Sequence, residues 1–165
     1  MSQGFLDALY GDPEVGAIFS DRGWAARMVA VEVALARVQE RLGVIPPGTA
    51  TRIAAAAADL ALDMAPLRQS MAQSGIPSTG MIAQLRAAAG EDAAAYVHRG
   101  ATTQDILDTA LVLQIRDALS HIDPEIEEIV GNLAALADRH RRTLMAGRTK
   151  SQQALPTTFG LKAAG

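Results

Sequence analysis

Two polar segments of this chain carry residue types that bind anions. The first reads HRGATTQD and begins at His98. It places an imidazole and the Arg99 guanidinium before a predicted helix that opens at Thr102 or Thr103. Unpaired backbone N–H groups at a helix start favour a carboxylate or a phosphate, so these four residues are candidate substrate ligands. A helix start alone explains the same residues, because Thr102 and Asp105 have the spacing of a capping box. From spacing alone we favour that structural interpretation.

The second polar segment, residues 147–158, is rich in hydrogen-bond donors. It reads GRTKSQQALPTT and lies between a predicted long helix and a helix expected to open near residue 156. The run Arg148–Gln153 is a candidate strip of donors for an anionic substrate, and the segment contains no carboxylate. A solvated loop with a Thr-Thr helix cap also explains it, and in isolation we favour this alternative because polar loops are common.

Other kinds of site find no support in the residues. The chain contains no dinucleotide-binding glycine motif, no P-loop, no HExxH and no EF-hand loop. The histidines at positions 98, 121 and 140 are far apart, without a carboxylate or another histidine at ligand spacing. With 0 Cys, zinc held by thiolates and disulfides are excluded. We therefore expect no metal and no cofactor.

Composition narrows the class of protein. The 165 residues are 49% hydrophobic and 20% charged, which is a globular balance rather than that of a disordered chain. A formal net charge of −3 argues against non-specific nucleic-acid binding. The start lacks the features of a signal peptide, and no apolar stretch approaches the roughly 18 residues of a membrane span. We expect a soluble, cytoplasmic protein that binds neither nucleic acid nor membranes.

Strong helix formers dominate, aromatic residues make up 4%, and no alternating run suggests a strand, so the predicted fold is all-α. Capping residues and Gly or Pro breakers delimit the helices. The expected ranges are 13–19, 21–42, 49–61, 64–74, 78–89 and 91–96. In the second of these, an apolar stripe is formed by Trp24, Met28, Val31, Leu35, Val38 and Leu42.

The strongest periodicity lies in the C-terminal half. Apolar residues at alternating spacings of 3 and 4 form a coiled-coil-like seam, made of Val112, Ile115, Leu119, Ile122, Ile126, Ile129, Leu133 and Leu136. Pro124 keeps the phase of the seam, which predicts either a kink or a helix restarted after an Asp123 cap. A helix over residues 103–142 would be about 60 Å long, whereas a compact globule of this size is about 40 Å across. The chain should therefore be elongated and should pack its seam against helices from other chains or from further sequence.

Taken together, the two polar segments resemble the two conserved boxes of the fumarase/aspartase superfamily. Residues 98–109, HRGATTQDILDT, are similar to the first box, and residues 147–162 to the second. Within the superfamily the resemblance is strongest to the cycloisomerases that lactonise 3-carboxy-cis,cis-muconate, on the QQALP run and the GLKAAG ending. Adenylosuccinate lyases are the alternative, although they usually carry histidines where this chain has Lys150 and Gln153.

The resemblance implies an all-α fold and a homotetramer whose active sites are each built from three subunits. Residues 1–100 would form an N-terminal helical domain, and residues 101–165 the first part of a central bundle of long helices. The reaction would close a lactone by adding a substrate carboxylate oxygen across a C=C bond, in protocatechuate breakdown. Thr102, Thr103 and His98 would bind the polycarboxylate substrate at the helix start. Residues 149, 152 and 153 would line the same pocket from a neighbouring subunit.

Lys150 is the candidate catalytic residue, because it stands where many superfamily members carry the histidine linked to acid catalysis. We expect it to pair with a substrate carboxylate rather than to move protons. The superfamily's third box, a Gly-Ser-Ser loop, does not occur in this chain. We therefore expect an N-terminal part of a longer enzyme that is inactive alone. A non-catalytic helical assembly module is the remaining alternative, since it requires only the seam and the caps.

Overall fold

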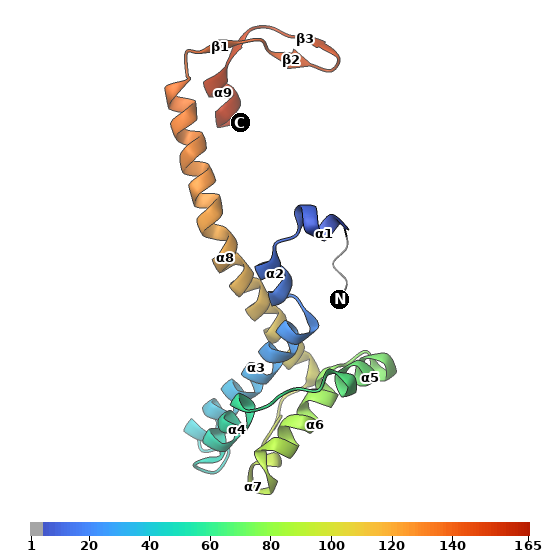
Figure 1. Ribbon diagram of the computed structural model, residues 1–165. Helices are drawn as coiled ribbons and strands as arrows, with labels where there is room; N and C mark the ends of the chain where they lie inside the picture. The colour runs from blue at the N-terminus through green and yellow to red at the C-terminus, as the bar shows by residue number, and fades with distance from the viewer. Residues whose placement is uncertain (1–4) are drawn as a thin grey trace. The chain divides into compact units, whose positions relative to one another are not determined.

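The computed structural model describes residues 5–165, apart from the side chains of Phe5 and Asp7, and confirms the all-α prediction (Figure 1). Two compact units divide at Ala118, inside the longest helix, and each is described by itself. Unit 1 is the part up to Ala118 and unit 2 is Leu119–Gly165. The helices in the described residues are α1 (Phe5–Tyr10), α2 (Pro13–Ile18), α3 (Asp21–Arg41), α4 (Thr49–Ala58), α5 (Met64–Ser74), α6 (Ser78–Ala89), α7 (Glu91–Ala94), α8 (Thr103–Arg139) and α9 (Phe159–Ala164).

Capping side chains begin helices α2, α3 and α5 of unit 1 where the sequence predicts. Asp12 accepts the N–H of Val15 at the start of α2, and Ser20 accepts that of Gly23 at the start of α3. Asp63 caps α5 in the same way. Helices α4 and α7 end at residues 58 and 94, earlier than the expected 61 and 96. The local capping signals therefore determine the helix starts better than the helix ends.

Helices α3, α4, α6 and α7 pack together in unit 1. The most deeply buried large side chains include Met28, Ile53, Met81 and Leu85. The side of α3 that faces this core differs from the predicted stripe. Of the stripe only Met28 is fully buried, whereas the other buried positions of α3 are Gly23, Ala25, Val29, Glu32 and Ala36. Small residues on this side let α3 lie close to its neighbours, so the prediction from large apolar residues was wrong by about one position.

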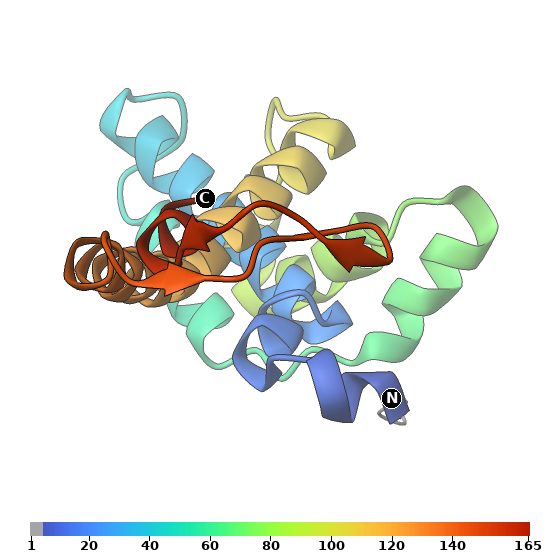
Figure 2. The ribbon, with the colours of Figure 1, turned by 90° about the horizontal axis from the view of Figure 1, so that it is seen from above.

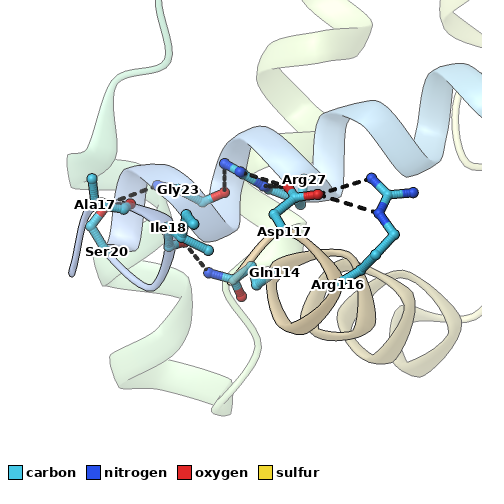
Figure 3. A network of polar contacts seen from close by, with 8 residues as sticks. All are labelled: Ala17, Ile18, Ser20, Gly23, Arg27, Gln114, Arg116 and Asp117. Carbon is cyan, nitrogen blue, oxygen red and sulfur yellow. Dashed lines mark hydrogen bonds and ion pairs between the residues drawn. The ribbon is translucent and has the colours of Figure 1, made fainter. Parts of the chain in front are cut away.

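Polar contacts join α2 and α3 to the part of α8 that belongs to unit 1 (Figure 3). The Arg27 guanidinium donates to Asp117 Oδ2 from Nε at 3.2 Å and from a terminal nitrogen at 2.8 Å. This contact, followed by that of Arg116, holds the pKa of Asp117 below its usual range. Gln114 donates through Nε2 to the Ile18 carbonyl at 2.5 Å. These contacts fix residues 114–117 of α8 against α2 and α3.

Helix α8 continues without interruption through Pro124, so a helix restarted at Asp123 is wrong. The seam side chains are largely exposed within their own units. Exposure is 61% at Val112 in unit 1 and 56% at Ile129 in unit 2. The described helices include none that is long and apolar enough to cross a membrane.

Unit 2 adds short strands that the sequence did not predict. They are β1 (Leu144–Met145), β2 (Arg148–Thr149), β3 (Gln152–Gln153) and β4 (Thr157–Thr158), paired antiparallel as β1 with β4 and β2 with β3. Figure 2 shows both pairs from above. Helix α9 begins at Phe159 rather than near residue 156, with the Thr158 hydroxyl accepting the Leu161 N–H. The Phe159 ring packs edge-on against His140, with centroids 5.1 Å apart.

Candidate functional site

His98 lies in the connection between α7 and α8 and is held by a buried carboxylate of α3. Its ring nitrogen Nδ1 is 2.6 Å from Glu32 Oε1, and its backbone N–H donates to Glu32 Oε2 at 3.0 Å. The Glu32 side chain is 1% exposed and that of His98 16%. Burying a carboxylate is unfavourable unless it is paired and hydrogen-bonded. Both oxygens of Glu32 are hydrogen-bonded to His98, which is thereby positioned.

Side chains of two further helix positions hold the same connection. His98 has a φ of 62°, a left-handed conformation that is uncommon for a residue other than glycine. Gln39 of α3 donates to the Arg99 carbonyl at 2.6 Å, and Arg86 of α6 donates to the Val97 carbonyl at 3.1 Å. Such a conformation persists where the surroundings over-determine it. The connection is therefore a prearranged element of unit 1.

The Arg99 side chain is directed by an aromatic neighbour. Its guanidinium carbon lies 5.5 Å from the centre of the Tyr96 ring, within the range of a cation–π contact. Arg99 is exposed, as the sequence interpretation of an anion ligand requires. A guanidinium held over a ring still has N–H groups that can donate to a carboxylate.

The capping box at the start of α8 is confirmed. Thr102 donates to Asp105 Oδ2 from its backbone N–H at 2.8 Å and from its hydroxyl at 2.9 Å. These contacts lower the pKa of Asp105, the backbone one most and the hydroxyl next, and a charge on His98 lowers it further. Thr103, the first residue of α8, is half-buried and takes no part in the box. The donors left for an anion are therefore Thr103, Arg99 and, when the ring is protonated, the second ring nitrogen of His98.

The second candidate group lies on the β2–β3 hairpin of unit 2. Thr149 pairs with Gln152 across the hairpin, and Lys150 lies in the turn between them. Ser151 completes the turn with a φ of 64°. Thr149, Lys150, Gln152 and Gln153 are all exposed. An open hollow of about 460 Å³ is lined by the Thr and both Gln side chains, among others, but not by Lys150.

The predicted ligands at the start of α8 thus lie in unit 1, and those of the β2–β3 hairpin lie in unit 2. The residue that the sequence interpretation missed is Glu32. The sequence contains a signal for it, because Glu32 is an acidic residue one helical turn after Met28 and one turn before Ala36. These three positions lie on the same side of α3, which is the buried side. Charged residues are rarely buried without a partner, so an acid at such a position indicates a specific role.

Comparisons with known proteins identify the family of the chain. The sequence family described as Lyase matches residues 10–165. Nitrosuccinate lyase of Streptomyces davaonensis is 44% identical over 168 residues, covering 100% of this chain and 35% of that protein. The crystal structure of a fumarate lyase from Mesorhizobium sp. BNC1 is 52% identical, with a TM-score of 0.83, over 93% of this chain and 36% of that one.

A lactonising enzyme is also among the similar structures. The beta-carboxy-cis,cis-muconate cycloisomerase of Acinetobacter calcoaceticus sp. ADP1 is 41% identical with a TM-score of 0.91, over 98% of this chain and 38% of that chain. The chain spans about a third of the length of the curated relatives it matches, for example 35% and 37%. With the family matched over residues 10–165 and these structures aligned along nearly the whole chain, the chain belongs to the lyase family, the fumarase/aspartase superfamily that its two polar segments resemble.

Proposed function

We propose that this chain contributes the N-terminal part of a cycloisomerase that converts 3-carboxy-cis,cis-muconate to a carboxymuconolactone. The observation that carries the proposal is the prearranged donor group at the start of α8. His98 is held by Glu32 there, with the exposed Arg99 next in the chain and Thr103 as the first residue of α8. The similarity to a solved muconate cycloisomerase, at a TM-score of 0.91, supports the choice of substrate.

The proposed reaction forms one C–O bond within the substrate. A carboxylate oxygen attacks one carbon of a C=C bond, and the electron pair of that bond moves to the neighbouring carbon, which takes a proton. The charge that develops lies beside a carboxylate, so positioned donors stabilise it more strongly than they stabilise the substrate. His98, Arg99 and Thr103 supply such donors, and Thr102 fixes the helix start through Asp105.

The hairpin residues complete the proposed pocket from a neighbouring subunit of a homotetramer. Thr149, Gln152 and Gln153 would donate to the substrate, and Lys150 would pair with one of its carboxylates. Because the chain spans about a third of its relatives' length, we assign the activity to a longer protein that contains it. We place that protein in the cytoplasm, with a small polycarboxylate as substrate and no cofactor.

The proposal is tested by assaying the protein made from its complete coding sequence on 3-carboxy-cis,cis-muconate. Loss of the diene absorbance and formation of the lactone are followed together. We expect turnover, and we expect Lys150→Met to raise KM about tenfold because a charge-assisted contact is lost. Absence of lactone would contradict the proposed reaction. An unchanged KM and kcat in Lys150→Met would contradict the proposed contact between Lys150 and a substrate carboxylate.

A second candidate is the β-elimination of a substituent from a substituted succinate. It is favoured by the 52% identity to a fumarate lyase and the 44% identity to nitrosuccinate lyase. Release of fumarate from such a substrate, without lactonisation of the muconate, would select this candidate. Adenylosuccinate is assayed alongside, although its phosphate calls for more cations near the helix start than Arg99 supplies. A protein inactive on all of these substrates, with no tricarboxylate bound at Thr103, would favour the non-catalytic assembly module.

A further inference from the structure

We propose that Glu32 is a positioning residue, whose buried carboxylate accepts the Nδ1–H of His98 and so presents the Nε2 nitrogen of that ring to the substrate. The position of the ring proton follows from unit 1 alone. Only the identity of the substrate rests on the proposed function.

The first step concerns which partner donates. An ionised carboxylate has acceptors only, and both Glu32 oxygens are used by His98. The backbone N–H always donates, so Oε2 is an acceptor. The 2.6 Å contact between Oε1 and Nδ1 is short, as is typical of a charge-assisted hydrogen bond. With the Glu32 side chain 1% exposed, a proton on Nδ1 gives the carboxylate the second donor it needs in place of water.

The second step concerns the orientation of the ring. The Glu32 carboxylate is hydrogen-bonded to both the backbone and the ring of His98. The carbonyls of the residues before and after His98 accept from Arg86 and Gln39. Rotation of the ring would break the contact to Oε1 and leave a buried carboxylate oxygen without that donor. Nε2 is therefore the nitrogen left for a ligand. It donates to a substrate carboxylate when the ring is protonated and accepts a proton when the ring is neutral.

The substitution Glu32→Gln reverses one hydrogen bond while preserving size. The His98 backbone N–H still requires an acceptor, so the Gln oxygen must take the place of Oε2. The Gln amide group then occupies the place of Oε1 and donates to Nδ1, which has to give up its proton. We therefore expect the neutral ring to carry its proton on Nδ1 in the unchanged protein and on Nε2 in Glu32→Gln.

The measurement is ¹⁵N NMR of protein labelled in its histidine rings, without substrate, at a pH where the His98 ring is neutral. Variants of His121 and His140 assign the signals. Glu40→Gln is the matched control, because Glu40 also lies on α3 and accepts a backbone N–H, that of Ala50, at 2.7 Å. It should leave the His98 signals unchanged. An Nε2–H ring in the unchanged protein, or the same proton position in Glu32→Gln, would overturn the proposal.

Kinetics of the complete enzyme provide a second reading. For Glu32→Gln we expect kcat/KM on 3-carboxy-cis,cis-muconate to fall about ten- to a hundredfold, while Glu40→Gln retains the original value. Full activity in an enzyme whose ring proton has moved would refute the positioning role. If neither protein lactonises the muconate but the proton still moves, the proposed substrate fails and the assignment of the Glu32 contact stands.

Discussion

The Asp105 carboxylate is hydrogen-bonded to the residue that caps α8. Its carboxylate accepts both the backbone N–H and the hydroxyl of Thr102, at 2.8 and 2.9 Å. The ionised form is therefore favoured in the folded chain, which is why the pKa of Asp105 is lowered. The same contacts hold Thr102 as the first cap of α8, next to the proposed substrate ligand Thr103.

The pH dependence of folding should report this contact. Because the folded-state pKa of Asp105 lies below its value in the unfolded chain, the stabilisation is fully present above the unfolded pKa, about 3.9, and is lost as the pH falls through the folded pKa. We expect Asp105→Asn to be less stable than the unchanged chain at pH 7, and the difference to shrink below about pH 4. Urea unfolding at pH 7 and pH 3 measures it, and equal differences at both values would contradict the assignment.

The Thr103 hydroxyl has a role that can be separated from helix capping. Thr103→Val keeps the shape of the side chain and leaves the Thr102–Asp105 box in place. We expect KM for the muconate to rise about tenfold, because a donor to a charged substrate is lost. Thr109→Val is the control, since the Thr109 hydroxyl donates to the Asp105 carbonyl, one turn away on α8. A similar KM change in both variants would argue against a substrate contact at Thr103.

At the scale of elements, local signals predicted some features and not others. The starts of α2, α3 and α5 follow from single capping residues, Asp12, Ser20 and Asp63, whose partners lie within three residues. The Glu32–His98 contact joins residues 66 positions apart, and two-residue strands such as β1 carry no periodicity of their own. Those features depend on tertiary packing, which no short window of sequence contains.

The docking of α9 in unit 2 depends on a close backbone approach. A Cβ on Gly160 would lie 2.5 Å from the Ala137 carbonyl oxygen and 2.6 Å from the Arg141 Cα. We expect Gly160→Ala to destabilise unit 2 by about 2 kcal/mol, because backbone atoms must move apart. Gly131→Ala on α8 is the control, since nothing lies within 4 Å of its added Cβ. It should stabilise the helix by up to about 1 kcal/mol.

Thermal unfolding of both glycine variants checks that prediction. The Gly160 variant should unfold at a lower temperature than the unchanged chain, and the Gly131 variant at a higher one. Opposite shifts from the same added methyl group separate close packing from the helix propensity that both substitutions improve. Equal shifts in one direction would show that α9 does not rest on the end of α8.

At the scale of the whole molecule, the feature to explain is the apolar side of α8, which is exposed within each unit as far as the structure describes it. In unit 2, Ile126 and Ile129 are 51% and 56% exposed, and they continue a seam of regular 3 and 4 spacing. Burying such side chains against other helices is favourable by about 25 cal/mol for each Å² removed from water. We attribute the seam to helix packing between copies of the protein, in the homotetramer proposed above.

A charge in that seam should therefore change the oligomeric state. Ile126→Asp would bury a carboxylate without a partner at a helix–helix contact, which is strongly unfavourable. We expect light scattering after gel filtration of the complete protein to show smaller species than the tetramer. Ala135→Asp adds the same residue to the same helix, but half a turn away from position 126 at 100° per residue, and should leave the assembly intact. The opposite result would be a tetramer that persists in Ile126→Asp and dissociates in Ala135→Asp. It would place the subunit contact on the other side of α8, and the seam would then need another explanation.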